Sequence, residues 1–268
     1  GAKIVIVGAG FIGLEGAAAA RQLQAEVVVV DTAPQLMARV ALPDLAVVAQ
    51  RVHERHGVAF RLGMGIEALI DVDHSRTLVK LSDGEALEAD IVVVGVGAIP
   101  NVELAQEAGL AVDDGILVNA ACVTSDPDIL AAGDATRHEN PRLGRYVRLQ
   151  SWHNAQHQAQ ALVRTLCEGH AVYEEIPWFW SDQFDQNLQF FGAPENWDDV
   201  IWRHGPEEGC VMAFQMKDHA IVSVQAVNPS YHMRPARKLV QTGATVDRAL
   251  LADPREVLHK LVPEKARV

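Results

Sequence analysis

The stretch KIVIVGAGFIGLE, residues 3–15, constrains the fold more than any other part of the chain. Its apolar run at 3–7 predicts a buried parallel strand that stops at Gly8, because parallel strands covered on both faces read as continuous apolar runs. Residues 11–24 are rich in helix formers and predict a helix, and EVVVVD at 26–31 predicts a second buried strand. Strand, helix and strand in this order make a βαβ unit, so the sequence predicts an α/β fold with a Rossmann-like, doubly wound domain.

The glycines of this stretch form the pattern G-x-G-x-x-G of a dinucleotide site. Gly8 permits a tight turn, Gly10 lets the backbone approach a pyrophosphate, and Gly13 lets the helix pack close to the strand. Asp31 closes the second strand and is placed to accept hydrogen bonds from ribose hydroxyls, which predicts NAD(H) rather than NADP(H). Arg39 tempers that preference, because an arginine serves a 2′-phosphate as well as a pyrophosphate or a ribose. The competing interpretation is a glycine-rich turn that holds no ligand.

Two further features belong to the same predicted domain. Glu15 follows the last glycine of the motif, where it either complements the dipole in the first turn of the helix or holds the nicotinamide carboxamide. Gly95 and Gly97 lie at the carboxyl end of another predicted buried strand, DIVVVGVG at 90–97. Ligands of open α/β sheets bind at that edge, so these glycines either clear space for a flat ring or form a simple strand-to-loop turn.

After the first βαβ unit, the expected secondary structure changes from alternating helices and strands to an antiparallel α+β arrangement. In the first part it predicts, in order, a helix from Pro43 closed by Gly57, a strand at 58–62, a β-meander at 66–90 with a turn at 82–85, and a helix at 101–109. A long helix is expected at 151–168. The last part predicts an α+β region with antiparallel strands in LQFFG, DVIWRH, CVMAFQM and HAIVSVQAVN and helices in SYHMRPARKLVQTG and PREVLHKLV.

The segment TSDPDILAAGDA, residues 124–135, gives a sharper signal. We expect a short buried strand that delivers Gly133 and Asp134 at its end. An aspartate there can bind a ribityl hydroxyl or a phosphate-bound water, although a Gly-Asp turn after a strand is also common in proteins without such a ligand.

Composition excludes several function classes. The chain has 23 basic and 35 acidic residues, a net charge of -12, which disfavours a nucleic-acid partner. No apolar run reaches the length of a membrane span, and no signal peptide is visible. The 3 cysteines form no C-x-x-C pair, which removes a redox dithiol and suits a reducing cytoplasm. His153 and His157 have metal-ligand spacing on one helix, but no third ligand is evident, so polar packing is preferred and no metal is expected.

The order GxGxxG-L-E, acid, VGVGAIPN and TSDPDILAAGD resembles the second half of the flavoprotein pyridine-nucleotide oxidoreductases. VRLQSWHNAQHQA at 147–159 and PWFWSDQFD at 177–185 narrow the resemblance to the NADH-dependent ferredoxin reductases of oxygenase systems, of the putidaredoxin reductase and biphenyl dioxygenase reductase type. The resemblance implies an NAD(H)-binding domain at 1–113, the C-terminal remnant of a split FAD-binding domain at 114–171, and a C-terminal α+β reductase domain at 172–268. It covers essentially the whole chain.

The resemblance also implies which residues hold the two cofactors, NAD and FAD. On the NADH side these are Gly8, Gly10, Phe11, Ile12, Gly13, Glu15, Asp31, Thr32, Arg39, Gly95, Gly97 and Ala98. On the flavin side they are Gly133, Asp134, Ser151, Trp152, Ala155 and Trp180, although the indoles would equally serve as filling between domains, and Gln150 falls near the nicotinamide. Two departures matter: the family usually carries glutamate where this chain has Gln150, and the family's first GxGxxG, which binds the ADP half of FAD, has no counterpart here.

The implied reaction is hydride transfer from NADH to FAD, followed by single-electron transfer to a [2Fe–2S] ferredoxin. It needs no side-chain acid, base or nucleophile, so no catalytic residue is assigned. Arg234, Arg237 and Lys238 form either a docking patch for an acidic ferredoxin or, as we favour, a solvated helix face. The alternatives are a flavin-free NAD(H)-binding fragment without turnover and a flavoprotein like apoptosis-inducing factor. The sequence leaves the oligomeric state open.

Overall fold

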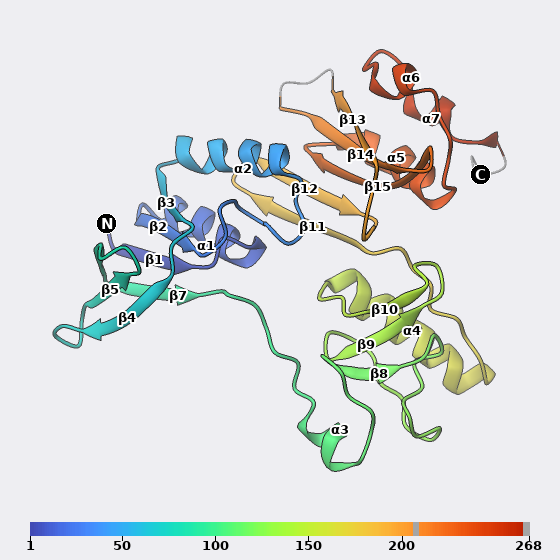
Figure 1. The fold of residues 1–268 in the computed structure, drawn as a ribbon, viewed down its shortest axis with the longest axis horizontal. Coiled ribbons are helices and arrows are strands. Elements are labelled where there is room, and N and C mark those ends of the chain that lie inside the picture. Colours follow the sequence, from blue (N-terminus) through green and yellow to red (C-terminus); the bar gives the residue numbers. More distant parts are fainter. Residues whose placement is uncertain (206–208, 265–268) are drawn as a thin grey trace. The chain divides into compact units, whose positions relative to one another are not determined.

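The computed structural model describes residues 1–205 and 209–264 (Figure 1). The chain divides into two compact units, each assembled from two segments. The first unit contains Gly1–Ala98 and Ser181–Leu188, and the second contains Ile99–Trp180 and Gln189–Val268. The hairpin at the start of the C-terminal region therefore contributes its tip to the N-terminal unit.

The first unit is built on a parallel sheet with the strand order β3-β2-β1-β7. Its strands are β1 (Lys3–Val7), β2 (Glu26–Asp31), β3 (Val58–Leu62) and β7 (Ile91–Val94). Two helices follow β1 and β2 in the chain, α1 (Phe11–Gln22) and α2 (Pro43–Arg55). An antiparallel meander is inserted before β7 and consists of β4 (Ile66–Asp71), β5 (Thr77–Leu81) and β6 (Ala86–Ala89). The predicted Rossmann-like arrangement with its β-meander is confirmed.

Two details of this unit differ from the expectation. The strand expected at 90–97 is shorter, and it is not buried, because Ile91 and Val94 of β7 are 50% and 60% exposed. In the described part of the chain β7 has a ladder partner on one side only, β1, so it is an edge strand. Glu15 is the fifth residue of α1 and lies outside its first turn, where the dipole interaction would have acted.

The first part of the second unit contains a small sheet with the strand order β10-β9-β8. The elements of this part are α3 (Glu103–Glu107), β8 (Ile116–Val118), β9 (Thr136–Asn140), β10 (Arg145–Val147) and α4 (Trp152–Glu168). The helix α4 begins and ends as its sequence dictates: the Ser151 hydroxyl accepts a hydrogen bond from the Asn154 amide, and Gly169 takes a left-handed conformation with φ of 80°.

The prediction of a buried strand in TSDPDILAAGDA is wrong. Residues 129–132 belong to no strand and form only an isolated bridge between Val123 and Leu130, residues 133–135 form a turn, and Asp134 is exposed. The strand lies after the Gly-Asp turn instead, as β9. An apolar run becomes a buried parallel strand only where neighbours pair along its length, and among the described residues this run has a single bridging partner.

The C-terminal region forms a five-stranded sheet of the order β11-β12-β15-β14-β13. Its strands are β11 (Trp178–Gln183), β12 (Gln186–Phe191), β13 (Asp199–His204), β14 (Val211–Lys217) and β15 (Ala220–Val227). The helical elements after it are η1 (Ser230–His232), α5 (Met233–Gln241), α6 (Arg248–Ala252) and α7 (Leu258–Leu261). The helix expected in PREVLHKLV is thus reduced to α7, and α6 was not expected from the sequence.

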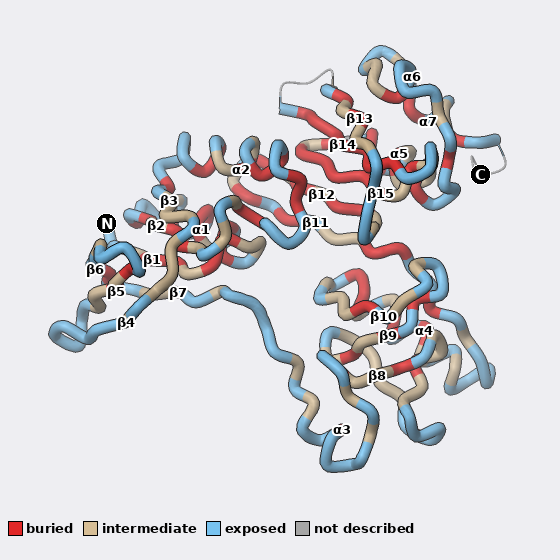
Figure 2. The backbone as a smooth tube through the Cα atoms, viewed as in Figure 1, coloured by how far each residue is buried: buried red, intermediate tan, exposed pale blue. Residues whose placement is uncertain are grey.

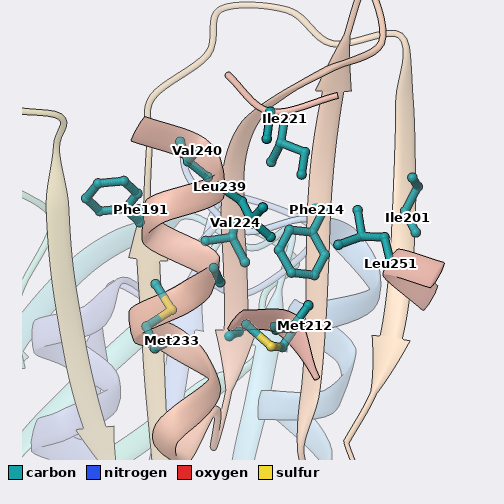
Figure 3. Packing of buried hydrophobic residues seen from close by; sticks show 14 of the residues in the cluster. Phe191, Ile201, Met212, Phe214, Ile221, Val224, Met233, Leu239, Val240 and Leu251 are labelled. Atoms are coloured by element: carbon teal, nitrogen blue, oxygen red, sulfur yellow. The ribbon is translucent and has the colours of Figure 1, made fainter. Parts of the chain in front are cut away.

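One face of this sheet packs against α5 and α6. Phe214, Val224 and Leu239 are fully buried in this layer and Leu251 of α6 joins them (Figure 3). Figure 2 shows burial concentrated along β14 and β15, of which β14 is buried at every position except the last. Among the described residues no helix is both long and apolar enough to cross a membrane.

Candidate functional site

The carboxyl ends of β1, β2 and β7 meet at one edge of the first unit's sheet. The backbone amide of Gly8 donates to the carbonyl of Val30 at 2.8 Å, and that of Gly95 donates to the carbonyl of Val7 at 2.8 Å. These bonds continue the sheet by one residue beyond the ends of β1 and β7. They bring the glycine motif and the loop at 95–98 together at the edge where such sheets bind ligands.

The glycines of the motif have different reasons to be glycine. A Cβ atom on Gly13 would collide with the carbonyl oxygen of Gly8, and a Cβ atom on Gly8 would collide with the carbonyl oxygen of Gly95. A Cβ atom on Gly10 would meet nothing within 4 Å. Internal packing therefore requires glycine at 8 and 13, whereas the bare Cα of Gly10 opens onto free space beside the start of α1. This fits a pyrophosphate approaching the helix N-terminus.

Asp31 lies at the end of β2 and holds the glycine loop. Its Oδ2 accepts a hydrogen bond from the Ala9 amide at 2.6 Å, and its Oδ1 accepts one from the Ala33 amide at 2.7 Å. Each carboxylate oxygen has two acceptor sites, so one site on each oxygen stays available for a ribose hydroxyl. The sequence assigned only the ribose role, and the structural role in fixing the loop was missed.

Arg39 brings a cation to this edge of the sheet. A Cβ atom built on Gly97, which has φ of 119°, would lie 3.7 Å from Nη1 of Arg39. The guanidinium therefore lies beside the loop after β7, while Thr32 and Ala98 are exposed at the same edge. An exposed cation at this place suits the phosphates or ribose of a dinucleotide.

Glu15 has a partner that no sequence pattern indicated. Its Oε1 accepts a hydrogen bond from the hydroxyl of Ser181 at 2.6 Å. Behind Ser181, the Gln183 amide donates to the Ser181 hydroxyl at 3.0 Å and its oxygen lies 2.9 Å from Nε2 of His53. Burial lowers the pKa of His53 more than its bond to Gln183 raises it, so the imidazole is neutral. Ser181, Gln183 and His53 lie far from Glu15 in sequence, which is why the motif did not find them.

In the second unit the turn at Gly133 and Asp134 is held against α4. The amide of Gly133 donates to Oε1 of Gln158 at 2.8 Å, and the Thr136 hydroxyl donates to the carbonyl of Gly133 at 2.8 Å. Partial desolvation raises the pKa of Asp134, and Arg148 opposes that shift. The turn therefore presents an exposed carboxylate beside the N-terminal half of α4.

Aromatic side chains gather at the start of that helix. Trp152 and Trp180 are 66% and 38% exposed, and their rings meet edge to face with centroids 6.0 Å apart. Trp178 continues the cluster, with its ring centroid 5.0 Å from that of Trp180. Exposed indoles fit a flat, polar-edged ring system such as a flavin. Gln150 is exposed and Ala155 half-buried in the same stretch.

The histidine pair of α4 and the basic cluster of α5 take part in packing. His153 is buried and stacks on His157 with centroids 4.0 Å apart, and burial lowers its pKa to about 4. The described residues contain no group of three or more His, Cys, Asp or Glu that could hold a metal ion. Arg237 does not share the exposed face of Arg234, because its guanidinium lies 3.9 Å from the ring centroid of Trp178.

The cysteines offer no dithiol. Cys122 and Cys210 are buried and Cys167 is exposed, and none of them forms a disulfide in the described part of the chain. Burial raises the pKa of Cys122 to about 11, which keeps its thiol protonated and unreactive.

Comparison with known families agrees with this arrangement. Residues 1–159 match the family described as pyridine nucleotide-disulphide oxidoreductase, and residues 178–262 match the family described as reductase C-terminal.

Curated relatives include two reductases of bacterial oxygenase systems. The chain is 43% identical to the anthranilate 1,2-dioxygenase system ferredoxin–NAD(+) reductase component of Burkholderia cepacia, over 95% of this chain and 63% of that protein. It is 35% identical to putidaredoxin reductase of Pseudomonas putida, over 97% of this chain and 62% of that protein. The chain thus spans less than two thirds of the length of the relatives it matches.

Solved structures give the same neighbourhood. The ferredoxin reductase for the CYP199A2 system from Rhodopseudomonas palustris superposes with a TM-score of 0.92 at 38% identity, covering 98% of this chain and 65% of that one. The reductase in a covalent putidaredoxin reductase–putidaredoxin complex gives a TM-score of 0.91 at 33% identity, covering 97% and 63%. The motif glycines and the loop at 95–98 form the glycine edge of the first sheet, the family model matches more than half of the chain, and these relatives are more than 30% identical to it. The chain therefore belongs to the pyridine nucleotide-disulphide oxidoreductase family.

Proposed function

We propose that this chain is the NADH-binding and C-terminal part of an FAD-dependent reductase that passes electrons from NADH to a [2Fe–2S] ferredoxin of an oxygenase system. The observation that carries the proposal is the sheet edge in which Gly10 faces open space at the start of α1 while Asp31 holds the neighbouring Ala9 amide. The names of two relatives supply the acceptor: one is the ferredoxin–NAD(+) reductase component of the anthranilate 1,2-dioxygenase system, and the other is the ferredoxin reductase for the CYP199A2 system.

In this proposal the first unit binds NADH through its backbone and a few side chains. Gly8, Gly10, Phe11, Ile12 and Gly13 receive the pyrophosphate at the start of α1. The other contacts on this side come from Glu15 near the nicotinamide, Asp31 and Thr32 at the adenosine ribose, Arg39 at the phosphates, and Gly95, Gly97 and Ala98 in the loop after β7. A carboxylate at the ribose favours NADH over NADPH, because a 2′-phosphate would face a like charge.

The second unit would hold part of the flavin. Asp134 and Gly133 offer a carboxylate and a turn for the ribityl-phosphate side, while Ser151, Trp152, Ala155 and Trp180 would line the ring side and Gln150 would lie near the nicotinamide. A flavin held by these residues would supply the hydride-accepting and single-electron chemistry, so the chain's residues need only bind and orient. Ser151 has a second task as the cap of α4.

The domain boundaries follow from the same proposal. They are an NAD(H)-binding domain at 1–113, the remnant of a split FAD-binding domain at 114–171, and an α+β reductase domain at 172–268. A cytoplasmic location is consistent with cysteines that form no disulfide in the described part of the chain.

The test measures dinucleotide binding and electron transfer by the purified chain. Calorimetry should give saturable NADH binding at least about tenfold tighter than NADPH, as expected where a carboxylate must face a phosphate. A flavin spectrum in the purified protein, with ferredoxin-dependent cytochrome c reduction, would support the reductase. A colourless chain that binds NADH would support the flavin-free fragment instead, and tighter binding of NADPH would contradict the nucleotide assignment.

A further inference from the structure

The hydrogen bond between Glu15 and Ser181 is the starting point. Its length of 2.6 Å lies in the range of O–H···O⁻ bonds, in which a hydroxyl donates to an ionised carboxylate. Glu15 is exposed on α1 and Ser181 is 1% exposed on β11, so the bond ties an exposed carboxylate to a buried hydroxyl. Both residues belong to the first compact unit.

Ser181, Gln183 and His53 form a series of hydrogen bonds in which each donor is directed toward Glu15. Because Ser181 gives its only proton to Glu15, its oxygen must accept, and the Gln183 amide nitrogen donates to it at 3.0 Å. The Gln183 oxygen then has to face a donor, and Nε2 of His53 lies 2.9 Å from it. A neutral His53 carrying its proton on Nε2 completes a chain of three hydrogen bonds directed at the carboxylate.

The chain of donors is rigid at its buried end. Gln183 and His53 are both 0% exposed. The ring of Phe184, at the tip of the β11–β12 hairpin, lies edge to face against His53 with centroids 5.0 Å apart and stacks on His56 at 3.9 Å. Buried, packed donors lose little rotamer freedom when they bind, so the order of the network is set by folding and not by the ligand.

We infer that Ser181, supported by Gln183 and His53, is a positioning residue that fixes the Glu15 carboxylate for the nicotinamide end of NADH. The inference rests on the proposed function, in which Glu15 faces the nicotinamide. Oε2 of Glu15, which has no hydrogen-bond partner among the described residues, is thereby held ready to accept an N–H from the carboxamide. Without Ser181 the carboxylate samples several rotamers, and part of the binding free energy is spent on ordering it.

The experiment compares two ligands on variants of the whole 268-residue chain. NADH carries the nicotinamide, whereas ADP-ribose occupies the same glycine edge without it. Ser181→Ala should weaken NADH binding about threefold to tenfold, the effect of one lost net hydrogen bond, and leave ADP-ribose binding unchanged. Ser181→Thr, which keeps the hydroxyl, should restore NADH affinity to within about twofold.

Two controls separate positioning from a general loss of structure. Ser223→Ala removes another buried serine hydroxyl, from β15 in the second unit, and should leave the affinity for both ligands unchanged. In the unaltered protein, NMR of the Gln183 side-chain amide should show a shift on adding NADH and none on adding ADP-ribose.

The inference is overturned if Ser181→Ala weakens both ligands equally or neither, or if the Gln183 resonance responds equally to both. Failure of the unaltered chain to bind either ligand would instead contradict the proposed function, and the inference would fall with it.

Discussion

At the scale of single residues, we expect opposite effects from alanine at two glycines of the motif: one substitution should reduce stability and the other NADH binding. Gly13→Ala should reduce the free energy of unfolding by about 1–3 kcal/mol, because its Cβ would be forced against the carbonyl of Gly8. Gly10→Ala should change stability by less than about 1 kcal/mol, since its Cβ meets nothing within 4 Å, yet weaken NADH binding more than about tenfold.

Urea unfolding and calorimetric NADH titration of both variants would check this pair. Gly16→Ala is the matched control, because its Cβ would make only an ordinary contact at 3.9 Å with Ile6 and should change neither quantity strongly. Normal NADH affinity in Gly10→Ala would argue that the open space beside α1 is not the pyrophosphate site.

The buried His138 makes the free energy of unfolding depend on pH. His138 is 1% exposed, neither ring nitrogen has a hydrogen-bond partner among the described residues, and burial lowers its pKa to about 4. A pKa below that of the unfolded chain means that the unfolded state takes up the proton first. This group's contribution is therefore complete above the unfolded pKa of 6.5 and is lost as the pH falls from there toward 4.

We expect His138 to account for about 2 kcal/mol of lost stability between about pH 7 and about pH 5. His138→Phe, which keeps a ring in contact with Tyr173, should remove this part of the pH dependence when unfolding is measured at the two pH values. His170→Asn, at an exposed position, is the control and should leave the pH dependence as it was. An unchanged slope in His138→Phe would contradict the assignment.

Individual residues also show which parts of the candidate site could be predicted from the sequence. Gly8, Gly13 and Asp31 lie together at one edge of the sheet, as their spacing predicts, because that spacing reflects a local strand–turn–helix geometry. Their role in binding NADH stays a prediction. Ser181 was not linked to Glu15, because a contact between side chains 166 residues apart leaves no local pattern. Asp31's bonds to the amides of Ala9 and Ala33 were missed for a related reason: backbone donors carry no residue identity.

At the scale of elements, the last two helices depend on one buried arginine. Arg203 of β13 is 1% exposed, and its guanidinium donates to the carbonyls of Leu251 at 3.1 Å and Asp253 at 2.7 Å, and also to those of Pro254 and Glu256. The planar fork of an arginine can satisfy several carbonyls at once, which fixes the end of α6 and the segment leading to α7.

Arg203→Met should therefore cost about 3 kcal/mol or more, because it leaves several carbonyls without a donor. Arg203→Lys should restore only part of the loss, since a single ammonium cannot span the same set. Thermal unfolding and limited proteolysis of 251–262 would measure both effects. Arg255→Met is the control: Arg255 is exposed and, among the described residues, forms an ion pair with Asp253, so a loss far smaller than that of Arg203→Met is expected. Equal losses in Arg203→Met and Arg255→Met would contradict this role.

Element prediction succeeded where local pattern and tertiary context agree. The βαβ unit, the β-meander and α4 follow from apolar periodicity, turn residues and the Ser151 cap. The run at 129–135 was placed in a strand on its apolar character alone, but strand formation depends on distant pairing partners. Likewise α6 is short and is preceded by Asp247, whose side chain caps the amides of Ala249 and Leu250. A five-residue helix has too little periodicity to stand out.

At the scale of the whole molecule, two compact units imply that a ligand stabilises them unequally. If NADH binds the edge of the first unit, saturation at about 100 times its dissociation constant adds about 2.7 kcal/mol to that unit's stability. Hydrogen exchange should then slow in the residues of the glycine edge and their strands, while amides in β14 and β15 keep their rates. Mass spectrometry of peptides from both units would read this out, and uniform slowing across β14 and β15 would contradict it.

The first unit is also discontinuous along the chain, since residues 181–188 complete what residues 1–98 begin. During synthesis the glycine edge emerges first, but the serine that fixes Glu15 follows after the ribosome has added some eighty further residues. At typical elongation rates that delay lasts on the order of 5–15 seconds. The newly made domain would spend this interval with the His53 side of α2 uncovered. Its final closure is therefore a late event in biogenesis, timed by the length of the inserted segment.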